Sequence, residues 1–333
     1  MPVLRRIQHA FPSADISWII GSQIMPLVGD IENVTWIGYD KTSGLQGLVA
    51  LYHRLNRSRF DVLLQMQTSL RSSIISLGIH AKRRIGYPLS ASKDQHHRFV
   101  HEYIGSPTQA HVLDTLMGFA DALDAPASPL RWDIPIPLDA RARINRELRD
   151  DLPVMVISPC SSERLRNWRN WGCGRWQSFT GRAQHQWGMQ IVLSGAGRKL
   201  EHEYGHAISA ELSTPPINLI GRINLKELLA LLSRASVVIC PDSGPVHMAT
   251  AVGTPVIGLY ATSNPDRTGP YLDRRWSINR YPYNVEHHLG RTVHDVKWGQ
   301  RIRHPLAMES ISVEDVLDSL DRLMRQHNQA HET

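Results

Sequence analysis

Short runs of β-branched and other apolar residues alternate along this chain with longer stretches whose apolar residues recur at helical spacing. The short runs predict strands over residues 16–20, 34–37, 62–65, 83–86, 154–157, 190–194, 217–220, 237–240 and 256–259. The longer stretches predict helices over residues 44–55, 69–77, 112–123, 175–187, 199–211, 225–233 and 245–252. Such alternation is typical of parallel sheets with helices on both faces, so an α/β fold is predicted.

A proline-rich stretch over residues 125–138 interrupts this alternation, because prolines so closely spaced disfavour both helix and central strand. The prolines are Pro126, Pro129, Pro135 and Pro137. A chain of 333 residues is also more typical of two domains than of one. We therefore predict one domain over residues 1–150 and a second over 151–333. The second domain ends in a helix over residues 313–325, which Ser312 caps with Asp315 three residues on.

The first domain begins with a predicted helix over residues 2–11, which has Pro2 in its first turn. A doubly wound domain normally begins with a strand, and the loop after that strand lies beside the ligand crevice. The sequence therefore predicts a doubly wound first domain in which either the reading frame starts late or the opening strand is missing.

Composition and charge limit the partners and the cellular compartment that we expect for this protein. Lys and Arg number 37 against 31 Asp and Glu, and the net charge of +6 suits nucleic acid, an anionic membrane surface or a phosphorylated small molecule. The basic residues are dispersed without interleaved aromatic residues, so we expect no nucleic-acid partner. Cys160, Cys173 and Cys240 form no C-x-x-C pair, which is typical of a reducing compartment. With no secretory signal and no apolar run of roughly 20 residues, a cytoplasmic location is expected.

The most informative segment follows the predicted strand over residues 237–240. Asp242 and Ser243 come directly after this strand, and Pro245 then stands at a first helical position. The free N–H groups and the positive dipole end of that helix would point into the crevice at the strand ends, and Gly244 would let a ligand approach the backbone. His247 lies in the first helical turn. The same pattern is also typical of a well-capped helix with an incidental histidine.

A second loop with anion-binding chemistry follows the strand over residues 154–157. It carries the hydroxyls of Ser161 and Ser162 and the guanidinium groups of Arg164 and Arg166, which can bind a diphosphate. An isolated basic loop is more often simply solvated. Two such loops at the carboxyl edge of one sheet favour an anion site.

Together these segments resemble glycosyltransferase family 9, the heptosyltransferases of lipopolysaccharide core synthesis. The resemblance is carried by residues 242–251, by Gly253-Thr254-Pro255 and the strand that follows, and by Asn264-Pro265-Asp266-Arg267. Supporting similarity runs through residues 60–67, Arg71-Ser72, residues 83–86 and Ile220-Gly221. It implies a GT-B fold, in which two Rossmann-like domains face a cleft. The first domain would bind the acceptor and the second the nucleotide sugar.

Site residues follow from the resemblance position by position. Asp242, Ser243, Gly244 and His247 would hold the sugar and diphosphate of ADP-L-glycero-D-manno-heptose. Ser161, Ser162 and Arg166 stand where the family usually has Thr, Thr and Lys. The basic Arg71, Arg83 and Arg84 of the first domain would suit a phosphorylated lipid A–core acceptor at the inner face of the inner membrane. No cofactor and no metal are implied.

The resemblance also implies the reaction, an inverting transfer in which an acceptor hydroxyl attacks the anomeric carbon while ADP departs. No Asp-x-Asp pair occurs in the sequence, which agrees with a mechanism that needs no metal. The family's general base is an aspartate that follows the first strand, a segment this chain does not contain. A catalytically silent relative that binds the nucleotide sugar is therefore the alternative.

Three other motifs match known chemical patterns, but their context favours a structural role. Residues 202–206 match the H-E-x-x-H pattern of zinc proteases, but they lie inside a predicted βαβ unit and contain a helix-weakening glycine. Residues 194–197 hint at dinucleotide binding but lack the third glycine. The histidines His96, His97 and His101, and the pair His287-His288, have no accompanying acidic or thiol side chains, which favours surface positions.

Overall fold

The chain folds into two compact units in a computed structural model that describes residues 1–105, 107–161, 168–210, 212 and 214–331. The units are Met1–Pro135 and Ile136–Thr333. The division falls some fifteen residues before the expected boundary at residue 150, because a helix over Leu138–Asn145 (α6) packs against the helix Leu225–Arg234 (α9) of the second unit. The sequence analysis predicted no helix there.

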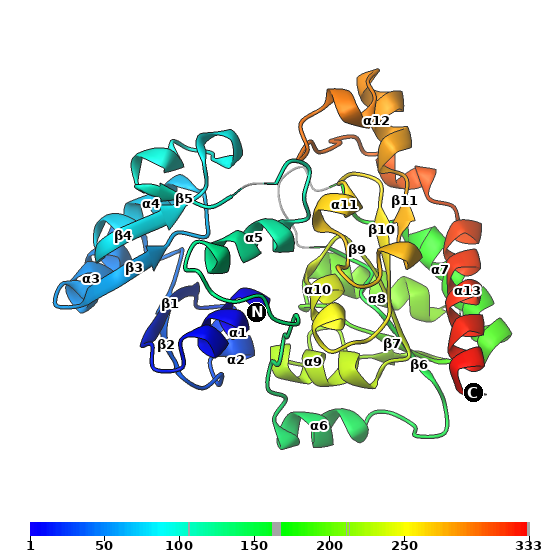
Figure 1. Ribbon diagram of the computed structural model, residues 1–333. Coiled ribbons are helices and arrows are strands. Elements are labelled where there is room, and N and C mark those ends of the chain that lie inside the picture. The colour runs from blue at the N-terminus through cyan, green and yellow to red at the C-terminus, as the bar shows by residue number, and fades with distance from the viewer. Residues whose placement is uncertain (106, 162–167, 211, 213, 332–333) are drawn as a thin grey trace. The chain divides into compact units, whose positions relative to one another are not determined.

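The first unit contains two small parallel sheets (Figure 1). One consists of β1 (Ile16–Gly21) and β2 (Val34–Tyr39), the other of β3 (Arg59–Leu64), β4 (His80–Gly86) and β5 (Glu102–Tyr103). Its helices are α1 (Pro2–Ala10), α2 (Met25–Val28), α3 (Gly44–Leu55), α4 (Leu70–Leu77) and α5 (Val112–Asp121), with 3₁₀ turns η1 (Leu89–Ala91) and η2 (His96–Arg98). The single doubly wound sheet expected here is thus divided, since β1 and β3 do not pair with each other among the described residues.

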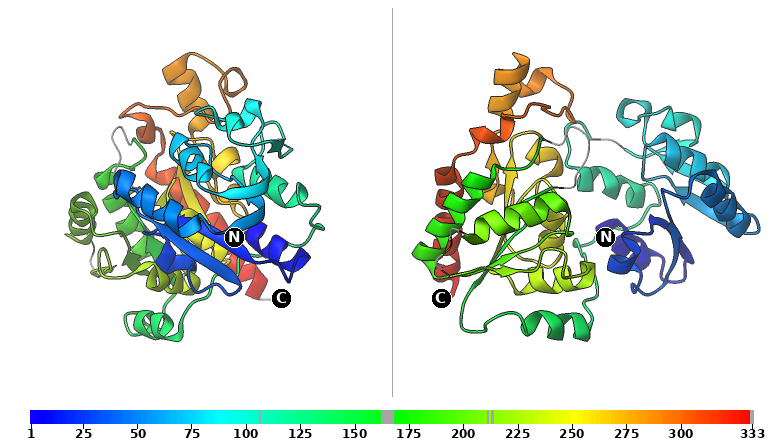
Figure 2. Two further views of the ribbon diagram at one scale, coloured as in Figure 1. Left: turned by 90° about the vertical axis from the view of Figure 1, so that its left-hand side faces the viewer. Right: turned by 180° about the vertical axis from the view of Figure 1, so that it is seen from behind.

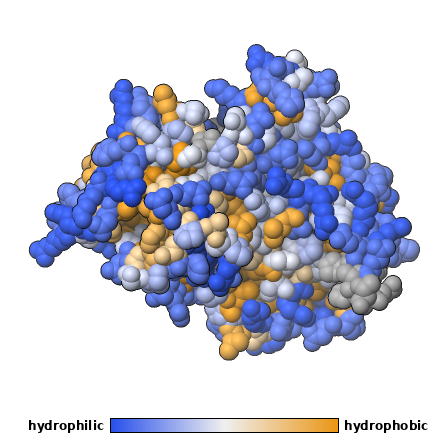
Figure 3. Space-filling view, viewed as in Figure 1, coloured by the Kyte–Doolittle hydropathy of each residue, from blue (hydrophilic) through white to orange (hydrophobic). Residues whose placement is uncertain are grey.

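Side-chain packing holds the two sheets of the first unit together. Ile19 of β1 and Phe60 of β3 pack against the same buried cluster, which includes Leu51 and Leu55 of α3. The strands of this unit are mostly half-buried. In Figure 3, hydrophobic residues interrupt the hydrophilic surface over this unit, and Leu45 and Leu77 are among its exposed apolar side chains.

The second unit is built on one six-stranded parallel sheet in the order β11-β10-β9-β6-β7-β8. Its strands are β6 (Val154–Ile157), β7 (Gln190–Leu193), β8 (Ile217–Asn218), β9 (Val237–Pro241), β10 (Val256–Tyr260) and β11 (Ile278–Asn279). The order runs outward in both directions from β6 and β9, as in a Rossmann fold. Such a sheet has its ligand crevice at the carboxyl ends of the two central strands, where the order reverses.

Helices cover both faces of this sheet (Figures 1 and 2). The remaining helices are α7 (Cys173–Trp187), α8 (Lys199–Ala210), α10 (Gly244–Ala251), α11 (Pro265–Thr268), α12 (Tyr281–Leu289) and α13 (Val313–His331), with 3₁₀ turns η3 (Arg274–Trp276), η4 (Val293–Asp295) and η5 (Ala307–Ser310). Every residue of β6, β7, β9 and β10 is buried, as expected for a parallel sheet with two covered faces. On one face, Trp171 and Trp176 pack edge to face with ring centroids 4.9 Å apart.

The main predicted elements are confirmed to within a few residues, and the helix 44–55 and the strand 154–157 agree in both bounds. Ser312 and Asp315 make the predicted reciprocal cap at the start of α13. The N–H of Ser312 donates to the Asp315 carboxylate at 2.9 Å, and the N–H of Asp315 donates to the Ser312 hydroxyl oxygen at 3.1 Å. The elements α2, α6, β5, β11 and α12 were not predicted, because none of them has a periodic apolar run long enough to recognise. Among the described residues, no helix has both the length and the apolar character needed to cross a bilayer.

Candidate functional site

The segments that directly follow β6 and β9 lie side by side at the reversal point of the second sheet. β6 and β9 are neighbours, with Ile157 paired to Ile239, and the N–H of Ser158 donates to the carbonyl of Ile239 at 3.1 Å. The chain leaves both strands in the same direction, so the segments after Ile157 and after Pro241 emerge at one edge. This edge is where ligands bind in open α/β sheets.

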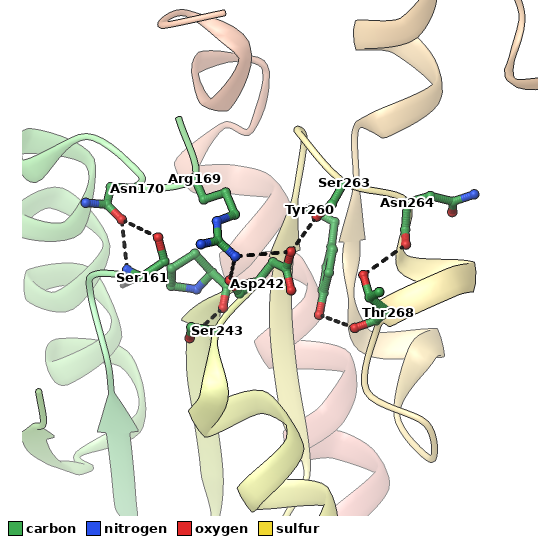
Figure 4. Close-up of polar contacts among 10 residues, drawn as sticks. Ser161, Arg169, Asn170, Asp242, Ser243, Tyr260, Ser263, Asn264 and Thr268 are labelled. Atoms are coloured by element: carbon green, nitrogen blue, oxygen red, sulfur yellow. Dashed lines mark hydrogen bonds and ion pairs between the residues drawn. The ribbon is translucent and has the colours of Figure 1, made fainter. Parts of the chain in front are cut away.

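Asp242 is the central group of this edge (Figure 4). Its residue is only 7% exposed, and its Oδ2 accepts a hydrogen bond from the Ser263 hydroxyl at 2.8 Å. Arg169 Nη1 lies 3.6 Å from the same oxygen and donates to the Asp242 backbone carbonyl at 3.0 Å. A buried carboxylate is stable only when paired or hydrogen-bonded, and these two neighbours meet that requirement.

The helix α10 begins at Gly244, two residues after Asp242. Ser243 is the residue before the helix, but its hydroxyl donates to the Pro241 carbonyl at 2.9 Å and makes no side-chain cap. Pro245 has no N–H, and the N–H of Val246 donates to the Ser243 backbone carbonyl at 3.3 Å and not to a side chain. Gly244 is exposed, and a Cβ there would meet nothing within 4 Å, so the backbone is open to a ligand. This arrangement can bind an anion.

Burial shifts the pKa values of two side chains near the start of α10, those of His247 and Cys240. The His247 side chain keeps surface open to solvent, while burial among neighbouring atoms lowers the pKa of its imidazole and the Asp242 carboxylate opposes that shift. A lowered pKa favours a neutral ring that can donate one hydrogen bond. Burial raises the pKa of the Cys240 thiol to about 12, so this cysteine is not a nucleophile at neutral pH.

Ser161 occupies the first of the two loops and is 3% exposed. Its backbone N–H and its hydroxyl both donate to Oδ1 of Asn170, at 2.8 and 3.0 Å. Ser162, Arg164 and Arg166 lie outside the described residues. The structure thus brings Ser161, Asp242, Ser243, Gly244 and His247 to one sheet edge, as the sequence predicted, and is silent on the other three.

Sequence reasoning missed Arg169, Asn170 and Ser263. Arg169 and Asn170 follow the tryptophan that ends the predicted loop, and no motif distinguishes them from a solvated polar pair. Ser263 directly precedes Asn264, the first residue of a segment that carried the family resemblance, and it was given no role. The adjoining Asn264-Pro265 was a usable signal for a capped turn, and Asn264 does cap α11 by accepting from the Asp266 N–H at 2.9 Å.

The three arginines predicted to bind acceptor lie in the first unit, and two of them contact other groups of that unit. Arg83 forms an ion pair of 2.6 Å with Glu102, whereas Arg84 donates to the carbonyls of Ser76 and Ile79. Adjacent residues of a strand point to opposite faces, so Arg83 and Arg84 cannot both face one ligand. Arg71 is exposed on α4.

The zinc-protease pattern lies on α8, where His202 and His206 are exposed. In the described part of the chain, no three His, Cys, Asp or Glu side chains are placed to hold a metal ion. Gly205 of that motif has a packing reason instead, because a Cβ there would lie 2.8 Å from Ile220 Cδ1. Gly197 and Gly221 both have positive φ, and a Cβ at either would lie within 3 Å of the Cα of the other, which accounts for these two glycines.

Solved structures with this fold define its class. A glycosyltransferase family 9 structure from Veillonella parvula superposes with a TM-score of 0.76 at 21% identity, covering 98% of this chain and 92% of that one. The Escherichia coli heptosyltransferase WaaC, solved with ADP, gives 0.73 at 15% identity, covering 97% and 94%. The fold is that of a GT-B glycosyltransferase.

The family follows from the sequence match. The model of glycosyltransferase family 9 (heptosyltransferase) matches residues 48–294, and this chain belongs to that family. It is 35% identical over 323 residues to the lipopolysaccharide core heptosyltransferase OpsX of Haemophilus influenzae, covering 97% of this chain and 92% of that protein. It is also 24% identical to an Escherichia coli lipopolysaccharide heptosyltransferase 3, over 97% and 94%. The chain is therefore a glycosyltransferase.

Proposed function

We propose that this enzyme transfers heptose from ADP-L-glycero-D-manno-heptose to the inner core of lipopolysaccharide, with inversion and without a metal ion. The observation that carries the proposal is the position of Asp242, held at the reversal point of the sheet beside the open start of α10. The 35% identity to a lipopolysaccharide core heptosyltransferase supports heptose as the sugar and the core as the acceptor.

The second unit would bind the donor. The N–H groups at the start of α10 and the exposed backbone of Gly244 suit the diphosphate, since a helix amino terminus attracts anions. Asp242 can accept hydrogen bonds from sugar hydroxyls, and a neutral His247 can donate one. The family resemblance adds Ser161, Ser162 and Arg166 to this donor set.

The reaction would be a single displacement at the anomeric carbon. An acceptor hydroxyl forms the new C–O bond on the face opposite ADP while the bond to the ADP oxygen breaks, which inverts the anomeric configuration. Negative charge grows on the departing diphosphate, and preorganised N–H dipoles and guanidinium groups stabilise it most at that stage. These fixed groups would take the place of a metal ion. The acceptor hydroxyl gives its proton to a general base as the new bond forms.

The acceptor would be a phosphorylated lipid A–core at the cytoplasmic face of the inner membrane, with no nucleic-acid partner. Of the three basic residues of the first unit, Arg71 is best placed to meet a phosphate, because Arg83 and Arg84 are engaged within their own unit. Neither the fold nor the family match supports the alternative of a catalytically silent relative.

A donor panel tests this proposal. Purified enzyme is given ADP-heptose, ADP-glucose or UDP-glucose with a heptose-free core acceptor, with and without EDTA, and the anomeric configuration of the product is read by NMR. We expect transfer from ADP-heptose alone, unaffected by EDTA. Asp242→Ala and Arg166→Ala should each lower kcat/KM for the donor by roughly tenfold or more, whereas Arg141→Ala on α6 should not. Unchanged donor kinetics in both site variants would refute the site, and a chelator-sensitive reaction would refute metal independence.

A further inference from the structure

Two consecutive side chains reach the two loops of the candidate site. Arg169 contacts Asp242 after β9, through a 3.0 Å hydrogen bond to the backbone carbonyl and a 3.6 Å approach to the carboxylate. Asn170 contacts Ser161 after β6, by accepting from its N–H and its hydroxyl at 2.8 and 3.0 Å. The dipeptide therefore links the two central loops of the sheet (Figure 4).

The Arg169–Asp242 pair is withdrawn from solvent, with side chains 13% and 10% exposed. In such surroundings an uncompensated carboxylate repels a nearby phosphate strongly, because the effective dielectric constant is low. Asp242 immediately precedes the amino terminus of α10, where the diphosphate of the donor would bind. An enzyme with a carboxylate at this place needs a positive charge beside it before it can accept an anionic donor.

We propose that Arg169 is the positioning residue of the donor site: it neutralises Asp242 and holds its carboxylate and carbonyl in place so that a nucleoside diphosphate can bind next to them. This rests on the proposed function, since it assumes that the donor diphosphate lies at α10. Arg169 acts through Asp242 and is not assigned a contact with the donor. Ser263 completes the arrangement by donating to the same carboxylate oxygen at 2.8 Å.

The geometry distinguishes this role from ordinary packing. A single nitrogen, Nη1, faces both the carbonyl and the carboxylate of one residue, so its removal changes the position and the charge of Asp242 together. If Arg169 served only to pack the loop, losing it would weaken donor binding equally whether or not Asp242 carried a charge. If it serves to neutralise Asp242, the loss should matter only while Asp242 is ionised.

A double-mutant cycle measures this difference. ADP binding is determined by calorimetry for the unaltered chain, Arg169→Met, Asp242→Asn and the double variant. We expect Arg169→Met to weaken ADP binding roughly 10- to 100-fold in the presence of Asp242, but less than about threefold in the Asp242→Asn background. Arg169→Lys, which keeps the charge, should recover most of the loss. Arg175→Met is the matched control, because Arg175 also donates to a backbone carbonyl, that of Glu309, and makes no described contact with the site.

Each outcome decides between the claims. Equal losses in the two backgrounds, or ADP binding by Arg169→Met within about twofold of the unaltered chain, would overturn the role of Arg169 while leaving the donor site in place. If Asp242→Asn binds ADP too weakly for the cycle, Arg169→Lys and Arg169→Met are compared directly, and equal losses again overturn the role. Failure of the unaltered chain to bind ADP would instead overturn the proposed function. Thermal unfolding of every variant separates lost binding from lost folding.

Discussion

A substitution of Asn170 tests how the loop after β6, which carries Ser161, is held in place. Its Oδ1 accepts from both the N–H and the hydroxyl of Ser161, a residue 3% exposed to solvent. Asn170→Ala removes an acceptor from two buried donors at once. A hydrogen bond of this kind contributes about 0.5–1.5 kcal/mol, so the loss of both bonds should lower the free energy of unfolding of the second unit by about 1–3 kcal/mol.

The measurement is urea denaturation followed by tryptophan fluorescence, since Trp171 and Trp176 lie in the core of the same unit. Asn170→Asp is the matched control, because it keeps an oxygen at the accepting position and should lose much less stability. Asn170→Ala should also raise the KM for ADP-heptose, as the loop carrying Ser161 loses its anchor. A change in unfolding free energy below about 0.5 kcal/mol would refute the reasoning, because the two bonds would then contribute almost nothing.

Two further predictions concern packing and pH. Gly205→Ala should be less stable in urea than Gly181→Ala on α7 by about 1 kcal/mol, because the new Cβ at residue 205 would lie 2.8 Å from Ile220 Cδ1 and must displace it, whereas a Cβ at residue 181 meets open space. Burial alone would raise the pKa of Asp315, but hydrogen bonds from Arg280 and Ser312 outweigh it and lower that pKa. A depressed carboxyl pKa gives stability that is present above the unfolded value of about 4 and is lost as the pH falls below it. Asp315→Asn should therefore flatten the melting-temperature profile below about pH 5, where the Asp315 carboxylate takes up its proton, and a parallel profile for the variant would contradict this.

The second unit shows how far sequence patterns reach. The strands 154–157 and 237–240 and the helices between them follow from apolar periodicity, because fully buried parallel strands leave a continuous apolar run that little else produces. The small elements β11 and α12 escaped prediction, since a two-residue strand and a nine-residue helix carry no such signal. In the first unit the strands are only half-buried, and the division of its sheet could not be read from their pattern.

Some residues of the candidate site could be predicted from the sequence, and others could not. Asp242, Ser243, Gly244 and His247 were predicted because a strand, a small polar turn and a helix start are local features, and local features are written in consecutive residues. Arg169 was not predicted as a site residue, because it meets Asp242 from 73 positions away. The predicted acceptor arginines show the converse, since Arg83 and Arg84 are both basic in the sequence but are directed to Glu102 and to backbone carbonyls by the pleat of β4.

The sequence by itself determined the α/β class, the order of the strands along the chain and the two loops of the candidate site, because each depends on residues that are near neighbours. Only the tertiary structure decided which strands are adjacent, and therefore that the loops after β6 and β9 meet at one edge. It also decided that a guanidinium and an amide from one dipeptide reach both loops. Charge compensation acts over a few ångströms in space without regard to distance along the chain, so no linear pattern records it.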